Sequence, residues 1–252
     1  MKKLRDYTPA LIVFILLVLF WQAYAGAGLV DKLVLPAPSD IYSSLLQHRG
    51  IIWDHTLQTL LETLTGLMLA VILGAGIGTA IFLFPRFRNT MYPLLVASQT
   101  VPIIALAPLL LIWFGFGILP KIIIVVLYCF FPIAVAVSDG LMNTPAHLVD
   151  LFKSMKASRW QILRYVRLPS ALPSFFSGLR ISVTYAVIAA IFGEYVGAYK
   201  GLGIFMQTAA HSRAIDLVFA SIFVIVSITL ILFALVAVLQ RLSLPWRYIG
   251  EE

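Results

Sequence analysis

Long stretches with few or no charged side chains restrict the fold of this chain more than any other feature. They cover residues of about 8–27, 57–84, 91–114, 119–138, 172–198 and 215–240. Each is long enough for an α-helix to cross a bilayer core, which takes about 20 residues. Only 12% of the 252 residues are charged, whereas soluble domains carry about 25%. The pattern predicts an all-α membrane protein with six transmembrane helices in a single membrane domain, 1–252.

The first stretch has two interpretations. Lys2, Lys3 and Arg5 precede the apolar run, and Ala23-Tyr24-Ala25 follows the small-x-small pattern of a signal-peptide cleavage site. The run is nevertheless long enough to cross the bilayer. We therefore interpret it as a retained first span.

The distribution of basic residues predicts the orientation. With the N-terminus in the cytoplasm, 13 of the 18 Lys and Arg residues fall in cytoplasmic segments. Because cytoplasmic loops carry an excess of Lys and Arg, both termini are expected to be cytoplasmic. The net charge of +7 has the same source, so nucleic acid is not an expected partner.

Several kinds of chemistry are not expected. Cys129 is the one cysteine in the sequence, which excludes an internal disulfide and a thiolate zinc site. The sequence contains no G-x-x-x-x-G-K-[ST] motif, so it has no P-loop for ATP. No metal site is expected from the histidines, which fall in loops or at span ends without ligand spacing: His48, His55, His147 and His211.

Small residues and prolines within the spans predict local packing. The Gly74-xxx-Gly78 pair in the second span allows another helix to approach closely. Pro102 and Pro108 are expected to bend the third span. On the outer side, a short helix is expected over 40–47.

The cytoplasmic loop 139–170 has more pattern than a simple connection needs. Leu148, Leu151, Phe152 and Met155 follow i, i+3, i+4, i+7 spacing, which places them on one face of a short helix. Ser158 and Gln161 form a capping box for a second helix, expected to end near Pro169. We therefore predict a helical hairpin. Its apolar face needs a partner, which is lipid headgroups, other helix ends of the same protein, or a second protein.

This loop resembles the EAA loop of ABC importer permease subunits. In that register Asp150 stands for the Glu of the motif, Leu151 and Phe152 for its two Ala, and Lys156 for its Gly. Similar residues extend over nearly the whole chain: Leu35-Pro-Ala-Pro-Ser-Asp-Ile41, Trp113-Phe-Gly-Phe-Gly117, Leu168-Pro-Ser-Ala-Leu-Pro173 and Gly193-Glu-Tyr-Val-Gly-Ala198. They are similar to the branch that serves nitrate, sulfonates, taurine and thiamine-precursor pyrimidines.

The resemblance implies a fold and a set of partners. The fold is that of type I ABC importer permeases with a cytoplasmic coupling-helix hairpin, in a bacterial cytoplasmic (inner) membrane. The expected partners are a second copy of the permease, two cytoplasmic ABC ATPase subunits, an extracytoplasmic solute-binding protein and the lipid bilayer. ATP and Mg would bind the ATPase, so this chain is expected to carry no cofactor and no catalytic residue.

The resemblance also implies which residues contact the ATPase. They are Leu148, Asp150, Leu151, Phe152, Met155, Lys156, Ala157, Ser158, Arg159 and Trp160. At the turn, glycine accommodates a left-handed backbone conformation that other residues adopt at a cost. Either the turn is right-handed here, or Lys156 contacts the ATPase directly.

Acidic residues inside spans are candidates for the translocation path. Glu62 and Glu194 lie near the outer ends of the second and fifth spans, and an acid in a span is a functional candidate by default. They either face the path or have a structural role. Pro102 and Tyr195 are further path candidates. Arg180 lies about 21 Å from Glu194 along the helix, so Asp139 is its more plausible partner.

Two other classes of function would need features that this sequence does not clearly show. An ion-coupled carrier would be indicated by an inverted repeat and ionisable groups at mid-membrane, and neither is evident. An intramembrane protease needs a nucleophile with His, or His and acidic ligands, inside spans. With the resemblance, the sequence favours the ATP-driven, binding-protein-dependent importer. The resemblance implies a small organic solute such as a thiamine-precursor pyrimidine, or a sulfonate, taurine or nitrate-type anion, as substrate.

Overall fold

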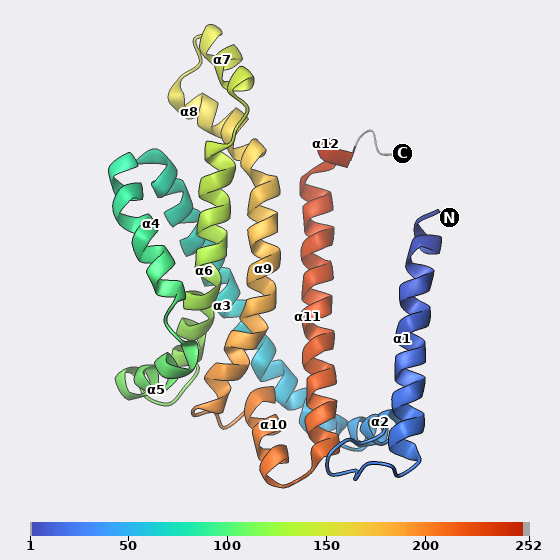
Figure 1. Ribbon diagram of the computed structural model, residues 1–252. Helices are drawn as coiled ribbons and strands as arrows, with labels where there is room; N and C mark the ends of the chain where they lie inside the picture. Colours follow the sequence, from blue (N-terminus) through green and yellow to red (C-terminus); the bar gives the residue numbers. More distant parts are fainter. Residues whose placement is uncertain (1, 249–252) are drawn as a thin grey trace.

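The computed structural model describes residues 2–248, and these residues form helices and the segments that connect them (Figure 1). The long helices are α1 (Lys2–Gly26), α3 (Arg49–Leu83), α6 (Leu119–Met142), α9 (Leu168–Tyr195) and α11 (Ile215–Ser243). The shorter ones are α2 (Pro38–Gln47), α4 (Pro85–Gln99), α5 (Ile103–Phe114), α7 (Ala146–Ser154), α8 (Arg159–Ile162), α10 (Leu202–His211) and α12 (Pro245–Tyr248). A π-helical turn, Leu163–Arg167, joins α8 to α9.

Four helices in the described part of the chain are long and apolar enough to cross a membrane. They are Arg49–Leu83, Leu119–Met142, Arg159–Tyr195 and Ile215–Ser243. They coincide with the second, fourth, fifth and sixth expected spans. The first expected span lies on α1, whose apolar part is Leu11–Gly26.

The third expected span, 91–114, was predicted to bend at its prolines, but it consists of two separate helices. The chain leaves the helical conformation after α4, and Pro102 is extended (φ −65°, ψ 121°) where α5 begins. Proline has no N–H to donate and disfavours a helical conformation in the residue before it. Figure 1 shows α5 turned away from the direction of α4. Pro102 therefore breaks this segment instead of only bending it.

Close contact between α3 and α6 forms the centre of the bundle. A Cβ atom on Gly74 would lie 2.6 Å from the carbonyl oxygen of Phe130, and one on Gly78 would lie 2.4 Å from that of Ala134. Only glycine fits at such distances, so the expected close approach at the Gly74-xxx-Gly78 pair is confirmed. The core between α3, α6 and α9 contains fully buried side chains, among them Ile124, Ile133, Val183 and Val187.

The outward faces of the long helices are apolar. Leu16 on α1, Ile72 on α3 and Leu230 on α11 are all exposed. In water such surfaces would be unfavourable, whereas lipid solvates them. The exposed apolar residues on these long helices thus fit a position inside the bilayer.

The two ends of the bundle differ. α7 and α8 project from one end, where α1 begins and α12 lies (Figure 1). α2, α5 and α10 lie at the opposite end (Figure 1). There α2, close to the predicted 40–47, is joined to α1 by bonds from Trp21 Nε1 to the Pro36 carbonyl (3.1 Å) and from Ser39 N to Gln22 Oε1 (3.0 Å).

Candidate functional site

The loop between α6 and α9 forms a hairpin with a small apolar core of its own. Val149 of α7 and Ile162 and Val166 of the returning arm are buried, and Leu148, Phe152 and Ala157 pack against them. Val149 was not among the predicted residues, because it lies outside the i, i+3, i+4, i+7 series. The hairpin is therefore a folded unit, as predicted.

The predicted apolar face of α7 is divided between two environments. Leu148 and Phe152 pack inward against the hairpin core. Leu151 and Met155 are 54% and 70% exposed. Residues four apart lie above one another on a helix, so each pair forms its own stripe. The stripe of Leu151 and Met155 is free to contact another surface.

The turn after α7 is left-handed. Lys156 has φ 58°. Its N–H donates to the Lys153 carbonyl (2.9 Å), and the Ala157 N–H donates to the Phe152 carbonyl (3.0 Å). These are the two bonds of a Schellman motif. The alternative of a right-handed turn at Lys156 is therefore wrong.

The capping box of the second arm is confirmed. The Ser158 hydroxyl accepts from the Gln161 N–H at 3.2 Å, and the Gln161 side chain accepts from the Ser158 N–H at 2.7 Å. Both bonds satisfy N–H groups that would otherwise lack partners at the helix start. This fixes where the returning arm begins.

The predicted end of this arm near Pro169 is wrong. The Leu168 N–H donates to the Leu163 carbonyl five residues back, and the helix continues into α9. Pro169 lacks an N–H and would clash with a carbonyl in a regular helix. The wider π-helical turn accommodates it. As a result, one 37-residue helix runs from Arg159 to Tyr195.

A second cluster of interest is polar and buried. Glu62 Oε1 lies 2.8 Å from Lys121 Nζ and accepts from Gln58 Nε2 at 2.8 Å. Glu62 is fully buried and Lys121 is 5% exposed. Lys121 lies at the start of the expected span 119–138, and no local pattern marks it as the partner of Glu62.

Glu194 joins three helices. Its carboxylate accepts from the Thr59 hydroxyl of α3 at 2.6 Å and from the Gly203 N–H at the start of α10. The Thr59 oxygen accepts from the Leu202 N–H at 2.8 Å. A Cβ on Gly201 would overlap the Glu194 carboxylate at 2.2 Å. The backbone before α10 therefore packs directly on this acid.

The other path candidates lie in different surroundings. Pro102 is exposed at the break between α4 and α5. Tyr195 is half-buried, with its ring edge toward Phe192. Of the four path candidates, the buried polar cluster thus contains Glu62 and Glu194. Packed side chains and backbone close this cluster to solvent in this conformation.

The expected pairing of Arg180 with Asp139 is wrong. Among the described residues no ion pair joins them, and the Arg180 guanidinium lies 5.5 Å from the centre of the Phe233 ring. That contact places Arg180 on the side of α9 that faces α11. Its charge is stabilised by an aromatic face.

The apolar helical bundle and the projecting hairpin define a membrane permease of the type I ABC importer fold. An inward-facing structure of the MetNI methionine ABC transporter superposes with a TM-score of 0.67 at 21% identity, covering 78% of this chain and 98% of that one. The family model of the binding-protein-dependent transport system inner membrane component matches residues 66–246. This chain belongs to that family.

Curated relatives cover nearly the full chain. A probable ABC transporter permease protein of Haemophilus influenzae is 42% identical over 92% of this chain and 94% of its own length. The formylaminopyrimidine transport permease protein ThiX of Halalkalibacterium halodurans is 37% identical over 98% and 99%. The chain is thus a multi-pass permease subunit of a binding-protein-dependent importer.

Proposed function

We propose that two copies of this permease form a solute path, driven by two separate ATPase subunits and supplied by a solute-binding protein on the opposite side. The hairpin of α7 and α8 then lies in the cytoplasm together with both termini. The excess of Lys and Arg in the segments at that end supports this orientation.

The observation that carries the proposal is the exposed stripe of Leu151 and Met155 at the end of a rigid hairpin. An apolar helix stripe held outside the bilayer fits a groove on a partner protein. Asp150, Lys156, Arg159 and Trp160 are exposed around it and are the polar and aromatic contacts we assign to the ATPase. The remaining predicted residues, Leu148, Phe152, Ala157 and Ser158, hold the shape of the hairpin.

The continuous helix from Arg159 to Tyr195 provides a route from the ATPase to the outer end of the permease. A push on the hairpin acts on one end of a rigid rod, and the other end carries Glu194 and its bonds to α3 and α10. We assign the cluster of Glu62, Lys121 and Glu194 to closing the outer end of the path.

For the substrate we propose a small heteroaromatic solute of the pyrimidine class. The relative named for formylaminopyrimidine transport matches over the full chain at 37% identity. The segment Gly193-Glu-Tyr-Val-Gly-Ala198 carries an aromatic side chain at the outer end of α9. A sulfonate, taurine or nitrate-type anion is the alternative from sequence.

Affinity purification from native membranes in mild detergent tests the ATPase contact. We expect a P-loop ATPase to copurify at about one per permease. The double variant Leu151→Asp/Met155→Asp should lose it while remaining inserted, because two charges replace the apolar stripe. Leu29→Asp is the matched control, since Leu29 is 68% exposed outside the hairpin. Unchanged ATPase recovery with the double variant would refute the assigned contact.

Competition in cells tests the substrate. Uptake of labelled formylaminopyrimidine should depend on this permease and be unaffected by excess taurine. Uptake of taurine alone would overturn the pyrimidine assignment and leave the importer assignment intact.

A further inference from the structure

A cleft of about 550 Å³ lies beside the hairpin, between its two arms and the end of α3. Its apolar wall is formed by Phe82, Leu83, Val149, Ile162 and Leu163, with Trp160 beside them. Its three remaining lining residues are the cations Lys153, Arg159 and Arg167. None of the lining residues named here is acidic, so the cleft combines an apolar wall with a positive rim.

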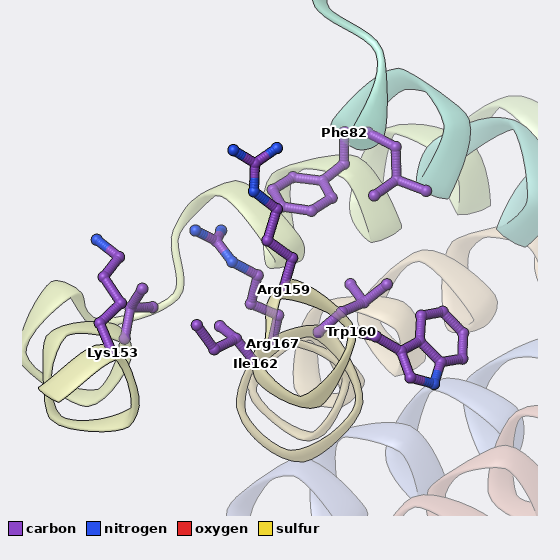
Figure 2. Close-up of a pocket in the computed structure, with 9 residues that line it drawn as sticks. Phe82, Lys153, Arg159, Trp160, Ile162 and Arg167 are labelled. Atoms are coloured by element: carbon purple, nitrogen blue, oxygen red, sulfur yellow. The ribbon is translucent and has the colours of Figure 1, made fainter. Parts of the chain in front are cut away.

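The two arginines present their charge in the same direction. In Figure 2 the guanidinium groups of Arg159 and Arg167 point the same way, next to the ring of Phe82. Arg167 is held in place, because one of its nitrogens donates to the Leu141 carbonyl at 2.9 Å and its guanidinium lies 4.7 Å from the centre of the Phe82 ring. Each arginine has five N–H donors, so most donors of Arg167 stay available.

The cations lack acidic partners inside the cleft. Among the described residues, Arg159 makes no side-chain hydrogen bond or ion pair, and Lys153 pairs only with Asp150, at 3.0 Å on the exposed face of α7. Two like charges that line one cleft favour an anion beside them, because the anion offsets their mutual repulsion. The fork of a guanidinium matches the oxygens of a phosphate.

The position of the cleft identifies the source of the phosphate. Phe82 and Leu83 are the last residues of the membrane-crossing helix α3. Leu83 and the adjacent Phe84 are 45% and 60% exposed, which leaves an apolar surface beside the opening. Trp160, 65% exposed, is of the residue type enriched where a membrane meets water. Of the proposed ATPase contacts, the apolar stripe of Leu151 and Met155 does not line the cleft, whereas Arg159 and Trp160 do.

We propose that this cleft binds the phosphate headgroup of an anionic phospholipid from the adjoining leaflet. Arg159, Arg167 and Lys153 contact the phosphate, and the acyl chains follow the exposed surface of Leu83 and Phe84. Occupation of the cleft at the base of the hairpin then depends on the headgroup charge of the surrounding lipids. The proposal rests on the proposed function only in placing this end of the bundle at the cytoplasmic leaflet.

Native mass spectrometry of the full chain in mild detergent tests this site. Phosphatidylglycerol should bind at least tenfold more tightly than phosphatidylcholine of the same acyl chains. Arg159→Gln should weaken phosphatidylglycerol binding by about tenfold, since a charged hydrogen bond to phosphate is worth about one decade of affinity. Adding Lys153→Gln should weaken it further. Arg167 is left unchanged because it also bonds to the Leu141 carbonyl.

Arg164→Gln is the matched control. Arg164 follows Arg159 by five residues and is exposed. Its guanidinium lies beside the ring of Tyr165, and it does not line the cleft. The Arg164→Gln variant should bind phosphatidylglycerol as tightly as the wild type. Equal binding of the two lipids, or equal losses with Arg159→Gln and Arg164→Gln, would overturn the proposal.

Two further outcomes would identify another occupant. Binding of millimolar inorganic phosphate without any binding of phosphatidylglycerol would show a site for free phosphate, and an Arg159→Gln variant that loses the ATPase but binds phosphatidylglycerol like the wild type would show an acidic surface of the ATPase in the cleft. Either result overturns the lipid assignment. ATP-driven uptake without a lipid preference would remove this inference and leave the importer function standing.

Discussion

The carboxylate of Glu62 and the ammonium of Lys121 lie 2.8 Å apart, and both side chains are buried between α3 and α6. The two residues are 59 positions apart in the chain. Each charge compensates the other where water cannot reach either. The pair therefore ties two membrane helices together near the end of the bundle that carries α10.

Removing one member of this pair should be far more damaging than removing both. Glu62→Gln or Lys121→Met alone leaves an uncompensated buried charge, and we expect a loss of about 3–5 kcal/mol in the free energy of unfolding. The double variant should recover most of that loss. Unfolding titrations of the detergent-solubilised permease measure all three. If the two single losses simply add in the double variant, the residues do not act as a pair.

The contact between α3 and α6 predicts opposite effects at two neighbouring glycines. Gly74→Leu should destabilise the protein by about 1–3 kcal/mol or more, because a Cβ there would lie 2.6 Å from the Phe130 carbonyl oxygen. Gly76→Leu should be neutral or stabilising, since nothing lies within 4 Å of a Cβ at that position. Thermal unfolding of the two variants is the measurement. Similar melting temperatures for both would contradict the packing of α3 on α6.

Substitutions at Lys156 separate the backbone cost of the left-handed turn from a contact of the lysine side chain with the ATPase. Lys156→Gly should stabilise the hairpin by about 1 kcal/mol, because glycine adopts the observed left-handed conformation without strain. Lys156→Val should destabilise it, since a β-branched residue fits that conformation poorly. Amide exchange at Ala157, whose N–H closes the turn, reports both effects. If Lys156→Gly instead reduces ATPase recovery, the lysine side chain contacts the ATPase.

The Thr59 hydroxyl should control the start of α10. Thr59→Val keeps the shape of the side chain but removes the donor to Glu194 and the acceptor for the Leu202 N–H. Leaving these buried groups unpaired costs about 1–3 kcal/mol. Hydrogen exchange in the first turn of α10 should therefore accelerate at least tenfold. Thr65→Val is the control, because that hydroxyl bonds within its own helix to the Leu61 carbonyl, and equal exchange in the two variants would refute the role of Thr59.

Features encoded by neighbouring residues were predicted well from the sequence. The Ser158 and Gln161 capping box formed as expected, because its two bonds connect residues three apart. The Gly74-xxx-Gly78 pair likewise marked a close helix contact, since small residues allow the approach whichever helix is the partner.

Features that depend on the tertiary fold were missed or wrong. Helical spacing placed Leu148, Leu151, Phe152 and Met155 together, but only packing of the second arm decides that Leu148 and Phe152 are the partly buried pair. Pro169 predicted a helix end, but the π-helical turn before it lets the helix continue. The partner of Glu62 lies on another helix, so no local pattern identified Lys121.

We propose that this permease moves solute only with the energy of a separate ATPase, and uptake into proteoliposomes measures this dependence. The permease, its copurified ATPase, its binding protein and labelled solute should give uptake that requires ATP and fails with Leu151→Asp/Met155→Asp. Without the ATPase, a proton or sodium gradient should drive no uptake of the solute. Uptake by the permease alone under such a gradient, unchanged by the double variant, would contradict the account and identify an ion-coupled carrier.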